Sequence, residues 1–195
     1  MTRTLAFDYP KALERGTWLF WKTGYAGTAL RDLLKKMGIG ESSFYNTLKS
    51  KKQAYLECLK HYNATVGRER GEALLSAPTA ALGIRALFKT VFDCLDDPKT
   101  PARACMMADS MAREVLDEPD LRKYVQTQLS MGSVAMTTRL TADKKAGLLP
   151  KSFNPELMTS IIITYLQGMF RMALVSYDRT LFERQVDVFL ESLGI

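Results

Sequence analysis

The sequence has few of the residues from which catalytic and metal sites are built: three cysteines and one histidine among 195 residues. Cys58, Cys94 and Cys105 lie far apart and form no CxxC pair, which argues against a disulfide framework or zinc site and favours a reducing cytoplasm. His61 lies in a helical pattern and is expected to be structural or solvent-facing rather than catalytic. Because the chain also lacks a glycine-rich phosphate loop, a metal cluster and a catalytic triad, we predict no enzyme, no cofactor and no metal.

Long hydrophobic runs are also scarce. The first residues, "MTRTLAFDYPK", contain no apolar run long enough for a signal peptide. The most apolar stretch, "SIIITYLQGMFRMALVSY", is interrupted by Gln167, Gly168 and Arg171. It therefore favours a helix buried on more than one side over a membrane span, and no membrane partner is expected.

Positive charge is concentrated at one end of the chain. The formal net charge is +6, but residues 1–70 hold 13 Lys and Arg against 6 Asp and Glu, whereas residues 71–195 hold 14 against 15. Basic charge confined to one segment is typical of a module that binds a polyanion, although a solvated basic face gives the same pattern.

The apolar residues recur at spacings of three and four almost throughout, which predicts an all-α chain. Gly24 and Gly38 are expected to end the first two helices, and Thr28 to cap the second. An interruption near Gly132 is compatible with the pattern. Nine helices are expected: about 8–23, 28–37, a short one of about seven residues that ends near 48, 51–75, 79–96, 102–116, 119–146, 155–177 and 180–193.

The short third helix follows the turn "GIGE" and has two different faces. Ile39, Phe44 and Leu48 can anchor it to the preceding helices. Two short helices joined by a tight glycine-containing turn are typical of a helix-turn-helix, whose second helix enters the major groove of DNA. An ordinary small amphipathic helix is the alternative. The polar face carries Ser42, Ser43, Tyr45, Asn46, Thr47 and Lys49.

The start of the fourth helix carries charge of an unexpected sign. Ser50 and Gln53 fit a capping box, which places Lys51 and Lys52 in the first helical turn. Cations are mildly unfavourable there because a helix N-terminus is already positive. We therefore expect a nearby anion, and interpret it as DNA phosphate.

Residues 8 to about 60 resemble the DNA-binding domain of TetR-family transcriptional regulators. The matching stretches are "LFWKTGYAGTALRDLLKKMGI" and "GIGESSFYNTLKSKKQAYL", and a weaker match follows at "RACMMADSMAREVLDEPDLRKYV". The resemblance implies the nine-helix TetR-like architecture. Its helix-turn-helix DNA-binding domain would cover residues 1–52, and its effector-binding and dimerisation domain would cover residues 53–195.

The resemblance also implies roles for individual residues. Thr28 and Tyr45 would contact phosphates, and Lys51 would clamp the backbone. Gly40 stands where the family usually has a serine or threonine cap, and Glu41 where it has a cation or a small residue. The candidate DNA contacts are Thr28, Gly40, Glu41, Ser42, Ser43, Tyr45, Asn46, Lys49 and Lys51.

The last two expected helices are apolar nearly all round, and a twofold partner would cover both of them in a four-helix interface. Alternatively, one of them is the central core of a monomer. The candidate interface residues are Ile162, Leu166, Met169, Phe182, Val186 and Phe189. Methionines suit either a pocket for apolar ligands or an ordinary core, and the candidate ligand-binding residues are Cys105, Met107, Met111, Tyr165 and Phe170.

The function expected from these features is sequence-specific DNA binding by a cytoplasmic transcriptional regulator. The resemblance implies a homodimeric repressor that a small-molecule effector releases from a palindromic operator. The alternative is a non-sequence-specific DNA-coating or adaptor protein that uses the same basic domain, and an enzyme is a distant third.

Overall fold

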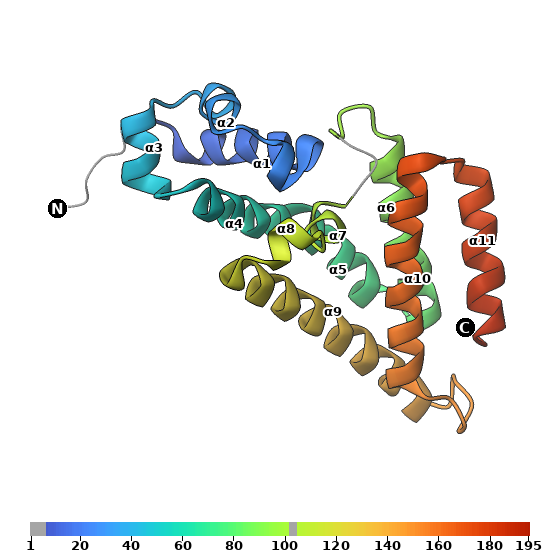
Figure 1. Ribbon diagram of the computed structural model, residues 1–195. Helices are drawn as coiled ribbons and strands as arrows, with labels where there is room; N and C mark the ends of the chain where they lie inside the picture. Colours follow the sequence, from blue (N-terminus) through green and yellow to red (C-terminus); the bar gives the residue numbers. More distant parts are fainter. Residues whose placement is uncertain (1–6, 102–104) are drawn as a thin grey trace. The chain divides into compact units, whose positions relative to one another are not determined.

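The computed structural model describes residues 7–101 and 105–195, and every regular element in these ranges is a helix (Figure 1). The all-α expectation is therefore confirmed. The chain divides into two compact units, which are considered separately. Unit 1 is formed by Met1–Val66 with Cys105–Val125, and unit 2 by Gly67–Ala104 with Gln126–Ile195.

Unit 1 contains the three helices expected at the N-terminal end of the chain. The first ends its regular part at Gly24, as expected, because this residue has φ 72° and ψ 172°, values outside the helical region. The helices of unit 1 are α1 (Tyr9–Gly27), α2 (Leu30–Met37), α3 (Glu41–Leu48), α4 (Lys51–Tyr62), α7 (Met106–Asp109) and α8 (Arg113–Leu116), followed by the start of α9 (Pro119–Lys145).

Close packing of α1 holds the core of unit 1 together. A β-carbon added at Gly16 would lie 3.3 Å from both Cys58 and Met37, so α1 approaches α4 and α2 closely at this glycine. Phe20 and Tyr55 are buried and meet edge to face, with ring centroids 4.9 Å apart. These contacts fix the scaffold that carries α2 and α3.

The helix expected at 102–116 differs from the structure. Residues 102–104 lie outside the described residues, and from Cys105 onward there are two four-residue helices instead of one long one. Ser110 lies at the break, where its hydroxyl donates to the Met106 carbonyl (2.6 Å) and pairs with the Tyr55 hydroxyl (2.9 Å). Such side-chain bonds compete with a continuous helix.

Unit 2 contains the two longest helices, α9 with 27 residues and α10 with 21, although α9 begins in unit 1. The expected helix at 51–75 is one helical run, but a π-helical segment, Asn63–Gly67, separates α4 from α5. The run through Gly132 is uninterrupted. The helices of unit 2 are α5 (Arg68–Ser76), α6 (Ala80–Asp96), the larger part of α9, α10 (Pro155–Val175) and α11 (Arg179–Ser192).

Helices α5 and α6 approach each other closely at Gly83. A β-carbon at Gly83 would lie 2.2 Å from the Leu74 carbonyl oxygen, so only glycine allows this approach. The buried Asp143 carboxylate of α9 accepts a hydrogen bond from the Ala80 N–H (2.6 Å) at the start of α6. An acceptor at a helix N-terminus satisfies a donor that the helix itself leaves unpaired.

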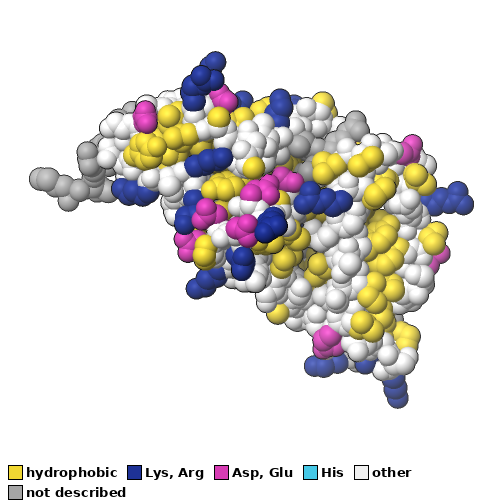
Figure 2. Space-filling model, viewed as in Figure 1, with side chains coloured by type: hydrophobic (Ala, Val, Ile, Leu, Met, Phe, Trp, Pro, Cys, Tyr) yellow, Lys and Arg dark blue, Asp and Glu magenta, His cyan; other side chains and the backbone are white. Residues whose placement is uncertain are grey.

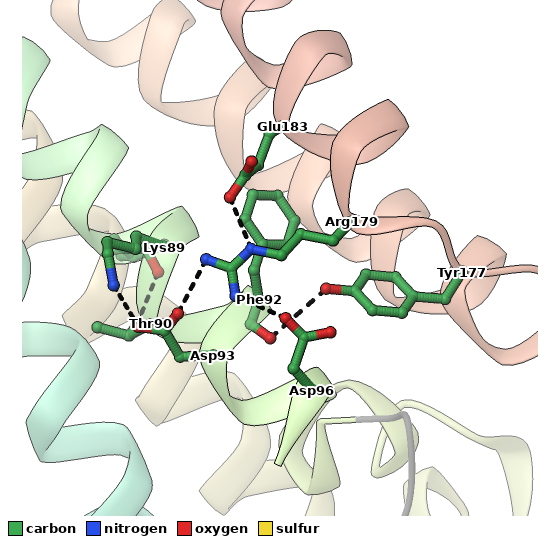
Figure 3. A network of polar contacts seen from close by, with 9 residues as sticks. Lys89, Thr90, Phe92, Asp93, Asp96, Tyr177, Arg179 and Glu183 are labelled. Atoms are coloured by element: carbon green, nitrogen blue, oxygen red, sulfur yellow. Dashed lines mark hydrogen bonds and ion pairs between the residues drawn. The ribbon is translucent and has the colours of Figure 1, made fainter.

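A cluster of ion pairs joins α6 to the start of α11 (Figure 3). The Arg179 guanidinium donates to Asp96 (2.6 Å) and Asp93 (2.9 Å) of α6, and to Glu183 (2.7 Å) of its own helix. Lys89 adds a second partner for Asp93 at 2.7 Å. The hydrogen bonds from Lys89 and Arg179 lower the pKa of Asp93.

Much of α10 is exposed in spite of its apolar composition. By length and composition alone it could cross a membrane, a criterion that core helices of soluble proteins also meet. Hydrophobic side chains lie along the face of α10 that Figure 2 shows. The large exposed apolar residues of α10 and α11 are Leu157, Met172, Leu174, Val175, Leu181 and Val188.

Candidate nucleic-acid interface

A glycine turn sets the direction of α3. Gly38 ends α2 in the left-handed conformation (φ 71°, ψ 35°), and its N–H donates to the Leu34 carbonyl at 3.0 Å. The Ile39 N–H donates to the same carbonyl at 3.2 Å, which completes a Schellman-type end. Gly40 then caps α3 without a side-chain hydrogen bond. Three residues, Gly38 to Gly40, therefore connect α2 to α3, a turn as short as a helix-turn-helix requires.

The two faces of α3 are separated as the sequence predicts. Phe44 and Leu48 are fully buried, and Ile39, which precedes the helix, is buried as well. The outward positions Glu41, Ser42 and Asn46 are exposed, as is Tyr45, whose side chain is 44% accessible. Ser43 is half-buried. A row of hydroxyl, amide and carboxylate groups therefore faces solvent from a helix that the core holds in place.

A strained residue ends α3. Lys49 has φ 62°, the one positive φ of a non-glycine residue within the described ranges. Its ammonium group donates to the Asn46 carbonyl at 2.7 Å, which satisfies one of the last helix carbonyls. Ser50 then caps α4 by accepting from the Gln53 N–H at 3.1 Å. Only two residues, the strained Lys49 and Ser50, therefore separate α3 from α4.

The adjacent lysines at the start of α4 have different environments. The Lys51 ammonium lies 4.8 Å from the centroid of the Tyr25 ring, and partial burial lowers its pKa. The Lys52 ammonium lies 3.4 Å from Glu118 and 3.5 Å from Asp120. The expectation of an external anion near both lysines is thus wrong for Lys52. The negative charge near this lysine comes from two carboxylates of unit 1.

Thr28 is also placed differently from its expected position as a cap. It is buried, and its hydroxyl donates to the Gly24 carbonyl (2.7 Å) and pairs with the Thr23 hydroxyl (2.6 Å). Ala29 is the N-cap residue of α2, without a side-chain hydrogen bond. The reason is that Gly24 breaks the helix and leaves a carbonyl that Thr28 can satisfy. The Thr28 side chain is therefore engaged within unit 1.

The candidate ligand-binding residues are divided between the two units. In unit 1, Cys105 is buried and accepts from the Tyr62 hydroxyl at 3.3 Å, whereas Met107 and Met111 are half-buried. In unit 2, the Tyr165 ring stacks on Phe189 at 3.9 Å, and Phe170 is buried. Neither unit by itself brings all five candidates together.

All candidate dimer residues belong to unit 2, and most of them are buried. Ile162, Met169, Phe182 and Val186 are buried within the protomer, and Leu166 and Phe189 are half-buried. Helical periodicity predicts α10 and α11 as helices, but it cannot distinguish the side that packs within the unit from the side left outside. The exposed apolar residues of α10 and α11 named above are a different set.

The three cysteines also differ in accessibility. Cys58 is buried in the α1–α4 packing, and burial raises the pKa of its thiol to about 12. Cys105 is buried, and Cys94 of α6 is half-buried, with its sulfur 3.8 Å from the Thr100 hydroxyl.

Sequence reasoning missed two aromatic residues that hold cations. Tyr25 lies beneath Lys51, and Trp18 of α1 lies beneath both Lys22 and Lys36. The spacing of four between Trp18 and Lys22 could have indicated the second contact, since such positions are neighbours on a helix. The other two contacts join separate helices and leave no mark in the sequence pattern.

Comparison with known proteins gives the geometry its context. No family model matches the chain. It is 36% identical over 132 residues to the uncharacterised HTH-type transcriptional regulator YezE of Bacillus subtilis (strain 168), and the match covers 66% of each chain, just under two thirds of the relative's length. It is 21% identical over 168 residues, 86% of this chain and 80% of the relative, to the HTH-type transcriptional repressor ComR of Escherichia coli (strain K12).

Solved structures match nearly the whole chain. The TetR-family regulator CifR, as a cysteine mutant in complex with a 26-base-pair operator DNA, superposes with a TM-score of 0.85 and 26% identity over 98% of both chains. The relatives named above are also helix-turn-helix regulators. The chain described here belongs to the TetR family of helix-turn-helix transcriptional regulators.

Proposed function

We propose that this protein is a homodimeric repressor that binds a palindromic operator and is released from it by a small molecule. The observation that carries the DNA-binding role is α3, which buries Phe44 and Leu48 and presents Ser42, Tyr45 and Asn46 to solvent. Short hydroxyl and amide side chains on a supported helix suit base edges and phosphates in the major groove. The operator-bound state of CifR supports the same use of the fold.

Lys51 suits a phosphate clamp. It lies in the first turn of a helix without an acidic residue in that turn, and Tyr25 holds its side chain in place. A phosphate there would interact favourably with both the ammonium group and the helix N-terminus, and it would raise the pKa that burial lowers. In this proposal residues 1–52 bind DNA, residues 53–195 bind the effector and form the dimer, and the protein acts in the cytoplasm.

A second copy of the chain is the proposed cover for α10 and α11. Exposed apolar side chains on two neighbouring helices favour association, and twofold symmetry pairs the same surface from each copy. A groove of about 450 Å³ in this region is lined by α10 and α11 residues that include Tyr165, Leu181 and Val188. The partner's side chains would fill it.

The effector-binding role is best supported by a groove between α6 and α11. Its volume is about 330 Å³, it has Phe88, Phe92 and Val186 among its apolar residues, and Arg85 and Asp187 pair beside it at 3.3 Å. This size and mixture suit a small amphiphilic molecule. A ligand that prefers one spacing of the DNA-binding domains would lower DNA affinity, and DNA would lower ligand affinity by the same factor.

The test is a selection of genomic fragments by the purified protein, followed by footprinting. We expect a protected palindrome whose half-site centres lie about 34–36 Å apart, bound by a dimer. Affinity for that site should exceed affinity for a scrambled duplex by a factor of about 10³ or more at the same salt concentration. Uniform coating of all fragments would instead favour the non-specific DNA-binding protein, and turnover of a substrate would indicate an enzyme.

A further inference from the structure

A surface tryptophan in unit 1 gathers two lysines. Trp18 of α1 is half-exposed, and the Lys36 ammonium of α2 lies 4.1 Å from the centroid of its ring. The Lys22 ammonium, one turn further along α1, lies 5.2 Å from the same ring. Both lysines are exposed. Two like charges therefore meet at one aromatic ring although they repel each other.

Further cations extend this surface. Lys11, Arg15 and Lys22 follow each other at helical spacing along the Trp18 side of α1, and Lys35 precedes Lys36 in α2. The Arg15 guanidinium lies beside Gly38: a β-carbon added at Gly38 would be 3.3 Å from the Nη1 atom of Arg15. We call Arg15, Trp18, Lys22, Lys35 and Lys36 the α1–α2 basic surface.

The lysines of the α1–α2 basic surface differ from other lysines because no carboxylate of the described residues pairs with them. Within residues 7–101 and 105–195, no carboxylate forms an ion pair with Lys22, Lys35 or Lys36, whereas Lys60 and Lys89 each pair with one carboxylate and Lys52 with two. Cations near the C-terminal end of a helix are stabilised by its dipole, typically by less than 1 kcal/mol each. That effect does not require Lys22 and Lys36 to converge on one ring.

The surface lies next to the turn that leads into α3. Arg15 contacts the first residue of that turn, Gly38, and α3 starts three residues later. Lys49 and Lys51 lie at the other end of α3. A helix of eight residues is about 12 Å long, which is about the width of the major groove. Cations beyond both ends of α3 can thus face the two sugar-phosphate strands that border the groove.

We propose that the α1–α2 basic surface binds backbone phosphates of the DNA strand at the N-terminal end of α3, opposite the strand held by Lys51. The inference rests on the proposed function of α3 and adds a second row of phosphate contacts to it. Trp18 positions the two ammonium groups before DNA arrives. Less side-chain entropy is then lost on binding than two unrestrained lysines would lose.

The test compares two double variants of the full-length protein. Lys22→Gln with Lys36→Gln removes both charges and leaves flexible polar side chains, and Lys145→Gln with Lys151→Gln is the matched control at exposed positions of unit 2. The dissociation constant is measured against salt concentration, with the selected genomic duplex and with a scrambled duplex. Circular dichroism checks that every variant is folded.

We expect the slope of log affinity against log salt to fall by about 0.9 for each lysine removed, and by a similar amount on both duplexes. The control should keep the wild-type slope. Trp18→Leu should keep the slope but weaken binding several-fold, because the charges remain and their positioning is lost.

Wild-type slopes in a folded Lys22→Gln/Lys36→Gln variant would overturn the inference. If the same variant instead lost only the association of further protein copies along a longer DNA fragment, the surface would serve a protein contact and the phosphate assignment would be wrong. The proposed function fails separately, namely if the wild-type protein does not distinguish the selected duplex from the scrambled one.

Discussion

Lys51 and Lys52 show how neighbouring residues acquire different roles from their surroundings. Lys52 is paired with Glu118 and Asp120, whereas Lys51 lies against the Tyr25 ring without a carboxylate partner among the described residues. Only Lys51 therefore has its charge available for an external anion. The sequence shows two equivalent lysines after a cap, and tertiary contacts make them different.

Asn46 and Lys51 should affect DNA binding in different ways. Asn46→Ala removes an exposed amide from α3, and we expect a loss of about 1–3 kcal/mol at one base pair of the site, with altered preference there. Lys51→Ala should weaken binding to all sequences alike and reduce the salt slope by about 0.9. Titrations against a panel of single-base operator variants measure both effects. Identical profiles for the two variants would contradict these roles.

Several local features of the fold could be predicted from single residues. Ser50 caps α4, Gly38 ends α2, and Phe44 and Leu48 are buried, because each follows from local geometry or helical spacing. The capping box is only half formed, because the Ser50 N–H donates to the Leu48 carbonyl (2.6 Å) and the Gln53 amide donates to Glu57 (3.0 Å). The predicted outward face of α3 is likewise what the structure shows, while its contacts with DNA stay a prediction.

At the level of elements, the crossing of α5 and α6 depends on one missing side chain. Gly83→Ala would place a methyl group 2.2 Å from the Leu74 carbonyl oxygen, so the helices must separate. We expect the free energy of unfolding to fall by about 3 kcal/mol or more. Gly132→Ala is the control, because nothing lies within 4 Å of the added carbon in the middle of α9, and a gain of about 0.5–1 kcal/mol is expected.

Chemical denaturation measures both glycine variants. Equal effects would show that backbone freedom rather than the crossing distance determines the result. The sequence could not predict that Gly83 lies against the Leu74 carbonyl oxygen while Gly132 faces open space. In the sequence, both glycines simply interrupt a helical pattern.

The ion pairs between α6 and α11 should make stability depend on pH. Hydrogen bonds from Lys89 and Arg179 lower the pKa of Asp93 in the folded state, so its contribution is present above the unfolded pKa and is lost as the pH falls below about 4. Asp93 is partly exposed, which limits the contribution to about 1 kcal/mol. Asp93→Asn should therefore be less stable than wild type at pH 7, with a smaller difference at pH 3.

Thermal or urea unfolding at the two pH values tests this sign. A difference that grows on acidification would contradict the assignment. Lys145→Gln, outside the cluster, is expected to show no such dependence.

At the level of the whole molecule, the surface of α10 and α11 should determine the oligomeric state. Val188 on α11 is 60% exposed, and Val188→Glu would bury a charge if a second copy covers it. We expect a folded monomer with strongly reduced operator binding. Val134→Glu on α9 is the matched control, since Val134 is 62% exposed and lies outside the proposed interface.

Sedimentation equilibrium measures the mass of each variant. A Val188→Glu protein that remains dimeric would place the interface elsewhere. A dimer lost in both variants would indicate a general effect of added charge rather than a specific surface.

In the larger C-terminal part, the sequence could not predict which side of each helix is buried or where a helix breaks. Its helices were predicted because their apolar residues repeat regularly, but Ile162, Phe182 and Val186 prove to be buried within the protomer, and other residues are exposed. At the break, Ser110 pairs with Tyr55, which lies far away along the chain. Sidedness and helix breaks come from tertiary partners, which a periodic pattern does not encode.

The unequal burial of the thiols offers a practical route to the geometry of the DNA complex. With Cys58 and Cys105 enclosed, a maleimide dye should react mainly at Cys94, so each protomer would carry a single fluorophore. Energy transfer between the two labels of a dimer would then act as a molecular ruler. It would report how far the protomers separate as operator and small molecule compete.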